Sequence, residues 1–484
     1  MNFLLIKTVG MMSPVTVGTL YGGYHSAIVY PPLGLEYIGA SLENIGHKVE
    51  IIDLNKEKST IESLKNSLSS SDAVGIGVYT NNYKYVSDVA KTIKEIRPEI
   101  PLIIGGPHCT FYQKRSLSDI PSADISLICE GEHTIIDIVH YLQKKKNLSD
   151  INGLYYREKN KIKSGKPFKI IKDLDSICFP ARHLVEKYEY GKFNNRYIYK
   201  PKFTTMITSR GCPSNCRFCA RYGNVIKNWG FRQRSAENVV KEIREIDERY
   251  NSVMITDDSF LFDNKRAHKI FDEIISSGTN IDLLIEGTRV DRADRELYKK
   301  MKKANVKFVV YGIESGNQDV LDFYKKGITL NQINKAVNLS NEMGFVTIGS
   351  FILGGPSETK KHIEDTIDLA CSLPLDGALF YPFYYQMGSQ LWSEAVEEGK
   401  ISKEEDFVSP DVNRGLGNFK AGEPDEYVIK AIKRFYLRPK YLFNQVYRAI
   451  LRKDFKLLKY GLEMIMSILT IRTIFFIYDS RDII

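Results

Sequence analysis

The chain has 484 residues, of which 43% are hydrophobic and 26% charged, and this ordinary globular usage excludes a disordered tail protein, a collagen-like fibre and a disulfide scaffold. No apolar run reaches the roughly 18–20 residues of a transmembrane helix, and the N-terminal stretch lacks the charged start and small-residue cleavage site of a signal peptide. We therefore expect a cytoplasmic protein of two or three domains.

The net charge of +9 is concentrated near the C-terminus, where residues 425–484 carry 12 Lys and Arg against 6 Asp and Glu, a balance of +6. A basic end is typical of contact with nucleic acid or with an anionic membrane surface, and equally of a solvated helical face.

Strand and helix patterns alternate through residues 1–145, which we expect to form one domain. Short apolar runs predict buried strands at residues 3–8, 48–53, 73–79, 101–105 and 123–129, with helices between them. This order predicts an α/β domain with a doubly wound, Rossmann-like parallel sheet. Ligands of such sheets lie beyond the carboxyl ends of the strands. The residues expected there are Thr80, Asn81, Gly105, Gly106, Pro107, Glu130 and Gly131.

The middle of the chain predicts a linker and then a second βα array. Residues 146–200 interrupt the alternation; within them Arg157–Lys166 is polar and rich in lysine, and Gly165 and Pro167 indicate a hairpin within a linker. Residues 201–400 predict strands at 204–209, 253–256, 283–288, 308–313, 347–353 and 378–384. Six βα units are too few for a closed eight-fold barrel and predict a partial, TIM-type (β/α)6 barrel. We expect residues 401–484 to form a helical C-terminal region.

Three of the seven cysteines have the spacing C-x-x-x-C-x-x-C, at Cys212, Cys216 and Cys219. Three thiolates on one tight loop can bind three corners of a four-iron cluster and leave the fourth iron open to a ligand. A zinc site needs four ligands, usually supplied in C-x-x-C pairs. No second pair exists in the sequence, so the pattern favours the iron–sulfur cluster.

A cysteine loop of this spacing after the first strand of a βα partial barrel resembles the radical S-adenosylmethionine (radical SAM) superfamily. The stretches Arg234–Val240, Gly312–Gly316 and Phe351–Glu358 strengthen the likeness. The stretches Pro31–Ala40 and Ile104–His108 are similar to the cobalamin-binding domains fused to many such enzymes. The resemblance covers roughly residues 1–400 and points to radical SAM enzymes with a cobalamin-binding domain, among them methyltransferases and anaerobic magnesium-protoporphyrin cyclases.

The resemblance implies roles for residues of the second array. Cys212, Cys216 and Cys219 match the ligands of a 4Fe–4S cluster that cleaves SAM to a 5′-deoxyadenosyl radical, and Phe218 matches an aromatic contact to adenine. Asp257 and Asp258 stand where the family often has Gly-Gly-Glu for the methionine ammonium; a helix N-cap is the alternative role.

Further positions are carried over from the same resemblance. Arg289 is a candidate for the methionine carboxylate, with a surface ion pair as the alternative. Glu314 and Ser315 stand where the family contacts the ribose hydroxyls, and Ile352 and Gly354 where it flanks adenine. The family pattern G-x-I-x-G-x-x-E is only partly kept, because Glu358 comes one place late and fits a helix cap equally well.

For the N-terminal domain the resemblance implies cobalamin. No D-x-H occurs in residues 1–145, so the cobalt would have no histidine from that motif on its lower face. Gly105, Gly106 and Pro107 would let the backbone approach the corrin closely, with Thr80, Asn81, Glu130 and Gly131 along its rim. The alternative is a domain that has lost its ligand.

Three functions remain open on the sequence. The first is cobalamin-dependent methyl transfer to an unactivated carbon or phosphorus centre of a small molecule. The second is a cyclisation or oxidation, and the third is a corrinoid-binding module with a structural cluster. An enzyme also needs an electron donor such as flavodoxin or ferredoxin, and we expect no nucleic-acid partner. The apolar segment 465–478 predicts either peripheral membrane contact, with a lipid-like substrate, or a lid on the barrel.

Overall fold

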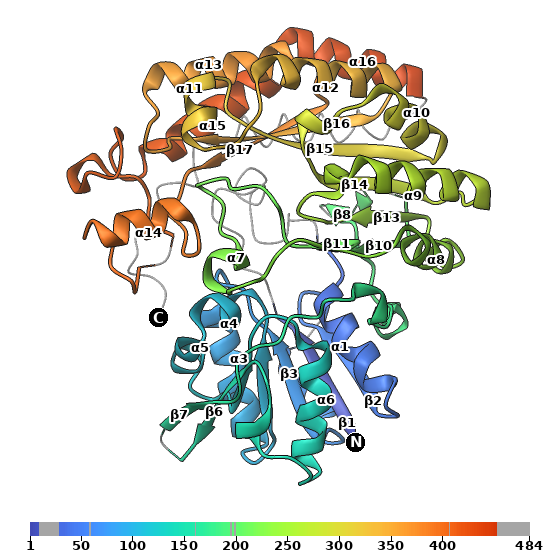
Figure 1. Ribbon diagram of the computed structural model, residues 1–484, viewed down its shortest axis with the longest axis vertical. Coiled ribbons are helices and arrows are strands. Elements are labelled where there is room, and N and C mark those ends of the chain that lie inside the picture. Colours follow the sequence, from blue (N-terminus) through green and yellow to red (C-terminus); the bar gives the residue numbers. More distant parts are fainter. Residues whose placement is uncertain are drawn as a thin grey trace.

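The computed structural model describes residues 1–8, 29–57, 60–159, 161–193, 196–197, 200–405 and 407–452. Two α/β units follow each other along the chain, and Figure 1 shows the N-terminal unit below the second one, with α4, α7, β11 and α1 near the boundary between them.

The N-terminal unit contains a seven-stranded sheet in the order β2-β1-β3-β4-β5-β6-β7, in which β1 to β5 are parallel. Its strands are β1 (Asn2–Lys7), β2 (Lys48–Asp53), β3 (Ala73–Gly77), β4 (Leu102–Gly105), β5 (Ile125–Leu127), β6 (Leu154–Glu158) and β7 (Lys161–Ser164). Its helices are α1 (Leu33–Glu43), α2 (Thr60–Leu68), α3 (Tyr83–Ile96), α4 (Pro107–Tyr112), α5 (Lys114–Asp119) and α6 (Gly131–Leu142). The chain adds β2 on one side of β1 and β3 on the other, so the doubly wound sheet predicted from the sequence is confirmed, with its switch point beside β1.

The hairpin expected between residues 146 and 200 is present as β6 and β7, which pair antiparallel. It does not stand alone in a linker, because β6 also pairs with β5. The first sheet therefore continues to Ser164, beyond residue 145. A second hairpin, β8 (Lys192–Phe193) with β9 (Arg196–Tyr197), precedes the barrel.

The six strands expected in residues 201–400 form one parallel sheet in chain order, β10-β13-β14-β15-β16-β17, so the partial barrel is confirmed. These strands are β10 (Phe203–Met206), β13 (Ser252–Ile255), β14 (Asp282–Thr288), β15 (Val306–Glu314), β16 (Val346–Leu353) and β17 (Gly377–Pro382). The helices around them are α8 (Ala236–Asp247), α9 (Asn264–Ser277), α10 (Arg295–Lys303), α11 (Gln318–Phe323), α12 (Leu330–Met343) and α13 (Lys360–Ser372). A short hairpin, β11 (Ser209–Arg210) with β12 (Arg232–Gln233), encloses the cysteine loop and α7 (Tyr222–Val225).

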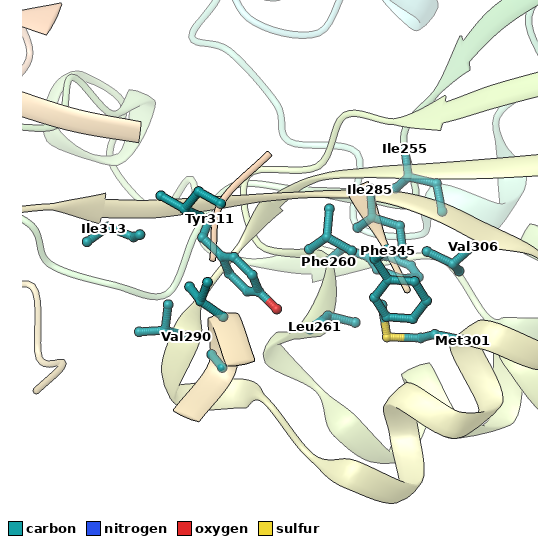
Figure 2. Packing of buried hydrophobic residues seen from close by; sticks show 14 of the residues in the cluster. Ile255, Phe260, Leu261, Ile285, Val290, Met301, Val306, Tyr311, Ile313 and Phe345 are labelled. Atoms are coloured by element: carbon teal, nitrogen blue, oxygen red, sulfur yellow. The ribbon is translucent and has the colours of Figure 1, made fainter. Parts of the chain in front are cut away.

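The largest core cluster lies between the barrel strands and the helices on their outer side. Figure 2 shows Ile255, Ile285, Tyr311 and Ile313 of the strands with Met301 and Phe345 of the helical layer and its loops. The buried hydroxyl of Tyr311 lies 2.6 Å from Ser340 Oγ on α12, so this polar group is satisfied inside the core. One face of the barrel strands is thereby closed, and their other face is left for the barrel interior.

The C-terminal region contains α14 (Gln390–Glu397), α15 (Glu423–Tyr436) and α16 (Pro439–Arg452). None of the helices in the described ranges is long and apolar enough to cross a bilayer. The apolar segment 465–478 lies outside the described residues.

Candidate active site

A cavity of about 610 Å³ lies between the two units, at the carboxyl ends of β1, β3, β4 and β5. Its wall on the barrel side is formed by Ile207, Ser209, Arg210, Gly211, Tyr222, Trp229, Thr256 and Asp258. This is the size of a small-molecule binding pocket. The cavity therefore extends from the carboxyl ends of the strands of the first sheet to the start of the cysteine loop.

On the sheet side of the cavity, glycines leave backbone atoms rather than side chains in the wall. Gly106 has a φ of +118°, and a Cβ there would come within 2.8 Å of the Val78 carbonyl oxygen. A Cβ on Gly131 would meet the Ile38 side chain at 2.8 Å. Gly105, Gly106, Pro107 and Gly131 all line the cavity, as the sequence predicts. A flat wall without side chains is suited to a large planar ligand.

Two of the predicted rim residues are replaced by their neighbours. Thr80 and Asn81 are not among the residues that line the cavity, whereas Tyr79 and Asn82 are. Asn82 is buried because it closes the turn: its Oδ1 accepts from the Tyr79 backbone N–H at 2.8 Å, and its Nδ2 donates to Thr8 Oγ1 at 3.2 Å. The loop after β3 thus turns Thr80 and Asn81 away from the ligand edge.

The cysteine loop starts directly after β11. Gly211 has a φ of +84°, and a Cβ there would lie 2.4 Å from the Gly230 carbonyl oxygen, so only glycine fits before Cys212. Burial raises the pKa of the Cys219 thiol to about 12, and Cys216, Asp258 and Cys212 add to the rise through their negative charge. The three thiols and Asp258 therefore lie in one partly buried environment. A cationic metal centre bound there would take the place of the thiol protons.

A buried ion pair lies beside the cysteines. Lys326 Nζ donates to Glu314 Oε1 at 2.6 Å, with side-chain exposures of 9% and 10%. Burial lowers the pKa of Lys326, but the Glu314 carboxylate outweighs it and leaves the pKa raised. Lys326 also counteracts the burial that raises the pKa of the Cys216 thiol. Sequence reasoning missed Lys326, because Lys325-Lys326-Gly327 carries no motif that sets it apart from a surface lysine.

The neighbouring Arg289 has protein partners. Its Nε donates to Asp291 Oδ1 at 2.9 Å and its Nη2 to the Lys326 carbonyl oxygen at 2.8 Å. Arg289 thus supports the backbone that carries Lys326. A contact between Arg289 and the methionine carboxylate stays a prediction. The other cation nearby is Lys326, whose side chain points at Glu314.

The two aspartates after β13 have different surroundings. Asp257 is buried and accepts three hydrogen bonds of 2.6 Å, from the backbone N–H and hydroxyl of Thr208 and from the Ser209 hydroxyl. Asp258 instead lines the cavity and raises the pKa of Cys219. Asp257 therefore ties β13 to the start of the cysteine hairpin, and Asp258 is the one available to a ligand.

Other predicted contacts prove to have structural partners. Ser315 is buried, with its Oγ 3.1 Å from Thr366 Oγ1. Gly354 has a φ of +83°, and a Cβ there would meet Pro424 of α15 at 2.5 Å. Glu358 does not cap the next helix, because Thr359 forms that N-cap. Ile352 and Phe218 pack at the edge of the same apolar cluster, which contains Tyr324, Phe383 and Tyr385.

The barrel interior presents a carboxyl and a phenol that sequence reasoning also missed. Along β15, β16 and β17 alternate residues keep part of their surface exposed while the others are buried against the helices. Glu286 of β14 and Tyr381 of β17 are among these partly exposed residues. Burial raises the pKa of Tyr381 to about 12, and the nearby Glu286 and Glu314 contribute. Glu286 makes no hydrogen bond or ion pair with the residues that the structure describes.

Comparison with known proteins identifies the two units. Residues 24–139 match the model of the B12 binding domain, and residues 206–370 match that of the radical SAM superfamily. An uncharacterised methyltransferase of Pyrococcus horikoshii is 32% identical over 86% of this chain and 90% of its own length. The chain belongs to the radical SAM superfamily.

Other relatives of this radical SAM chain have different reactions. A cytidylyl-2-hydroxyethylphosphonate methyltransferase of Streptomyces wedmorensis is 26% identical over 80% of this chain and 82% of its own. An anaerobic magnesium-protoporphyrin IX monomethyl ester cyclase of Cereibacter sphaeroides is 26% identical over 88% and 70%. In solved structures, the methyltransferase TsrM of Kitasatospora setae, with cobalamin and a 4Fe–4S cluster bound, shares the fold with a TM-score of 0.69 at 15% identity, over 90% and 89% of the chains.

The radical SAM family implies a 4Fe–4S cluster and SAM, and the B12 domain implies cobalamin. Among the described residues no three His, Cys, Asp or Glu side chains converge on a single metal ion. The loop that follows Gly211 carries three thiols, and this donor set fits a cluster in which each thiolate binds a different iron. The glycine wall fits a corrin, and no histidine of the described chain lines the cavity. His25 lies outside the described residues.

Proposed function

We propose that this radical SAM enzyme transfers a methyl group to an unactivated carbon of a hydrophobic small molecule, with the substrate held between the corrin edge and the barrel interior. One observation carries the proposal: a single cavity is bounded by the glycine wall of the first sheet and by the residues that lead into the cysteine loop. Reactants held on the two sides of one cavity need not diffuse between separate sites.

When bound, the cluster and SAM supply a radical and cobalamin supplies the methyl group. The protein's part is to bind, orient and exclude water. Asp258 would accept from the ammonium of SAM, because it is the aspartate that faces the cavity. Lys326 and Glu314 would fix the remaining polar groups of SAM beside Cys216.

Glu286 and Tyr381 would hold the substrate. Ile255 of β13 pairs with Ile285 of β14, so the residues that follow them in the sequence, Thr256 and Glu286, are neighbours. Thr256 also lines the cavity. The barrel interior around them presents Val310, Ile348 and Leu379, which are partly exposed and apolar. An acceptor carboxylate in an apolar wall favours a substrate with an apolar body and one hydroxyl or amine donor.

We further propose a reduced flavodoxin or ferredoxin as electron donor and a lipid-soluble substrate. The exposed side chains Phe443, Val446, Tyr447 and Ile450 recur at helical spacing on α16, and Lys440 beside them is exposed. This stripe supports contact with a membrane surface, from which such a substrate would be reached.

Ring closure is the second candidate, and it is supported by the similarity to the magnesium-protoporphyrin cyclase. The two functions differ in what SAM gives to the product. The reconstituted protein is incubated with reductant, cobalamin, SAM labelled with deuterium in its methyl group, and a lipid-soluble cell extract. Methyl transfer predicts a new labelled product by mass spectrometry, which Glu286→Gln should diminish. An unlabelled product that has lost two hydrogens would establish ring closure instead.

A further inference from the structure

Four charged side chains join the two units across the wall of the cavity. Arg210 Nη1 donates to Glu130 Oε1 at 2.7 Å, and its Nη2 donates to Glu132. Arg232 Nη1 donates to both oxygens of Glu130, at 2.8 and 2.9 Å. The two glutamates come from the loop and helix after β5, and the two arginines come from the β11–β12 hairpin.

This cluster is buried and neutral as a whole. The side chains of Glu130, Glu132, Arg210 and Arg232 are 2%, 7%, 12% and 11% exposed. Glu130, which the sequence places on the corrin rim, also accepts from the Ile171 N–H at 2.9 Å. Its carboxylate therefore accepts hydrogen bonds from three protein groups, which hold this part of the cavity wall in place.

The hairpin depends on these carboxylates. Arg210 and Arg232 are directly opposite each other in its antiparallel register. Two like charges in such a pair repel, and more strongly out of water. Glu130 lies between the two guanidinium groups and removes the repulsion. The two facing arginines of the hairpin are thus neutralised by a residue of the other unit.

The glutamate end of this charged cluster adjoins the expected corrin position, and its arginine end adjoins the cysteine loop. Glu130 and Glu132 flank Gly131, whose missing side chain opens the cavity wall. Arg210 is followed by Gly211 and Cys212, and Trp229, which packs against Gly211, lies under the Arg232 guanidinium at 4.7 Å. A shift of the Glu130–Glu132 segment therefore moves the first residue of the cysteine loop.

We propose that the Glu130–Arg210–Glu132–Arg232 cluster couples corrin loading to the cysteine loop, so that filling the cavity stabilises the iron–sulfur cluster. The proposal rests on the proposed function, because it requires that the cavity take a corrin. A ligand that packs on the Gly131 wall restrains the glutamates, and Arg210, which donates one hydrogen bond to each of them, passes that restraint to Gly211 and Cys212. Coupling between sites is reciprocal, so an intact cysteine loop also tightens corrin binding.

The test measures iron release from the full-length protein after anaerobic cluster reconstitution. An iron(II) chelator is added with and without saturating hydroxocobalamin, and the ratio of the two release rates is the readout. Couplings of this kind typically change equilibria by about 5–150-fold. We expect corrin to slow iron release at least five-fold in the wild-type protein.

Glu132→Met/Arg210→Met removes one charge of each sign and leaves the Glu130–Arg232 pair, so no charge is left buried alone. This variant should bind hydroxocobalamin more weakly, because both residues line the cavity, but once it is saturated, as followed by absorption, the ratio should fall to about one. Glu132→Gln, a milder change, should lower the ratio part of the way even where the double variant fails to fold. Glu405→Met/Arg414→Met is the control, since this ion pair lies within the C-terminal region and its loss should leave the ratio unchanged.

Three results would overturn the proposal. Equal release rates with and without bound corrin in the wild-type protein would show that the two sites are independent. An unchanged ratio in the double variant would show that another contact carries the coupling. A wild-type protein that binds no hydroxocobalamin would remove the cobalamin part of the proposed function together with this proposal.

Discussion

Lys326 Nζ lies 2.6 Å from Glu314 Oε1, and this buried pair is situated beside Cys216, which we propose as the second cluster ligand. Glu314 has a φ of +68°, in the left-handed region that a non-glycine residue rarely adopts, at an irregularity in the pairing of β15 with β16. Strained residues of this kind are concentrated at functional sites. The pair therefore combines a backbone feature and a charge at the expected SAM position.

Lys326→Met should leave the Glu314 carboxylate buried without a counter-charge. Removing one partner of a buried pair costs about 3–5 kcal/mol of unfolding free energy. Equilibrium urea denaturation of the variant measures this loss, and Lys326→Met/Glu314→Gln should recover most of it. SAM binding by titration should weaken in both variants. A double variant that binds SAM like the wild type would exclude the pair from the SAM site.

We expect Asp257 to contribute to the stability of the fold and Asp258 to the binding of SAM. Asp257→Asn replaces an acceptor oxygen by an NH₂ group opposite hydroxyl and N–H donors, so we expect a loss of about 2–3 kcal/mol in urea denaturation. Asp258→Asn should leave stability nearly unchanged and weaken SAM binding at least ten-fold. The reverse pattern would exchange the two roles.

The sequence predicted the large elements well because their signals are local. Apolar runs located the six barrel strands, and the cysteine spacing located the loop of Cys212. Side-chain partners were harder to predict, because they depend on contacts between distant segments. Glu130 was placed at the cavity by the sequence, but its partners Arg210 and Arg232, which are 80 and 102 positions away, were not foreseen. Lys326 was missed because its local sequence resembles that of a surface lysine, and Glu286 because no motif marks it as a residue of the barrel interior.

Glu36 on α1 should make the stability of the protein depend on pH. It is fully buried, and neither carboxylate oxygen has a hydrogen-bond partner in the described chain. Burial raises its pKa from 4.5 to about 7, although Arg182 and Lys7 pull it down; Glu242 adds to the rise. Because the folded state holds the proton more tightly, this contribution to stability is complete below pH 4.5 and is lost as the pH rises to about 7 and beyond.

Glu36→Gln keeps the shape and removes the titration. We expect the variant to be more stable than the wild type by about 1–3 kcal/mol at pH 8, with the difference disappearing near pH 5. Urea denaturation at both values measures this. A constant difference between the two pH values would show that Glu36 does not titrate in this range.

The exposed stripe of α16 should bind anionic vesicles. Phe443→Ser/Tyr447→Ser should reduce co-sedimentation with vesicles of phosphatidylserine and phosphatidylcholine, because it removes apolar surface from the lipid contact. Binding of the wild-type protein should also fade with added salt, since the screening length falls from about 10 Å at 0.1 M to about 3 Å at 1 M. Full-length protein that stays in the supernatant at low salt would contradict the membrane contact.

Replacing Cys212, Cys216 and Cys219 together by Ala should abolish iron binding. The wild-type protein, purified without oxygen, should hold about four irons per chain. Cys371→Ala serves as the control, because this thiol lies on α13, whose other residues pack on the outer side of the barrel, and it should leave the iron content unchanged. Iron retained by the triple variant would exclude these three cysteines as the cluster ligands.

We propose that one protein cleaves SAM at a cysteine-bound cluster and also uses SAM as a methyl source through cobalamin. The most direct test of this claim is anaerobic incubation of the reconstituted, corrin-loaded protein with reductant, SAM and the lipid-soluble extract, followed by mass spectrometry of 5′-deoxyadenosine and S-adenosylhomocysteine together. We expect both products from the wild-type protein, and no 5′-deoxyadenosine from the triple cysteine variant. Iron-loaded and corrin-loaded wild-type protein that forms 5′-deoxyadenosine without S-adenosylhomocysteine would contradict methyl transfer, and formation of neither would contradict the claim as a whole.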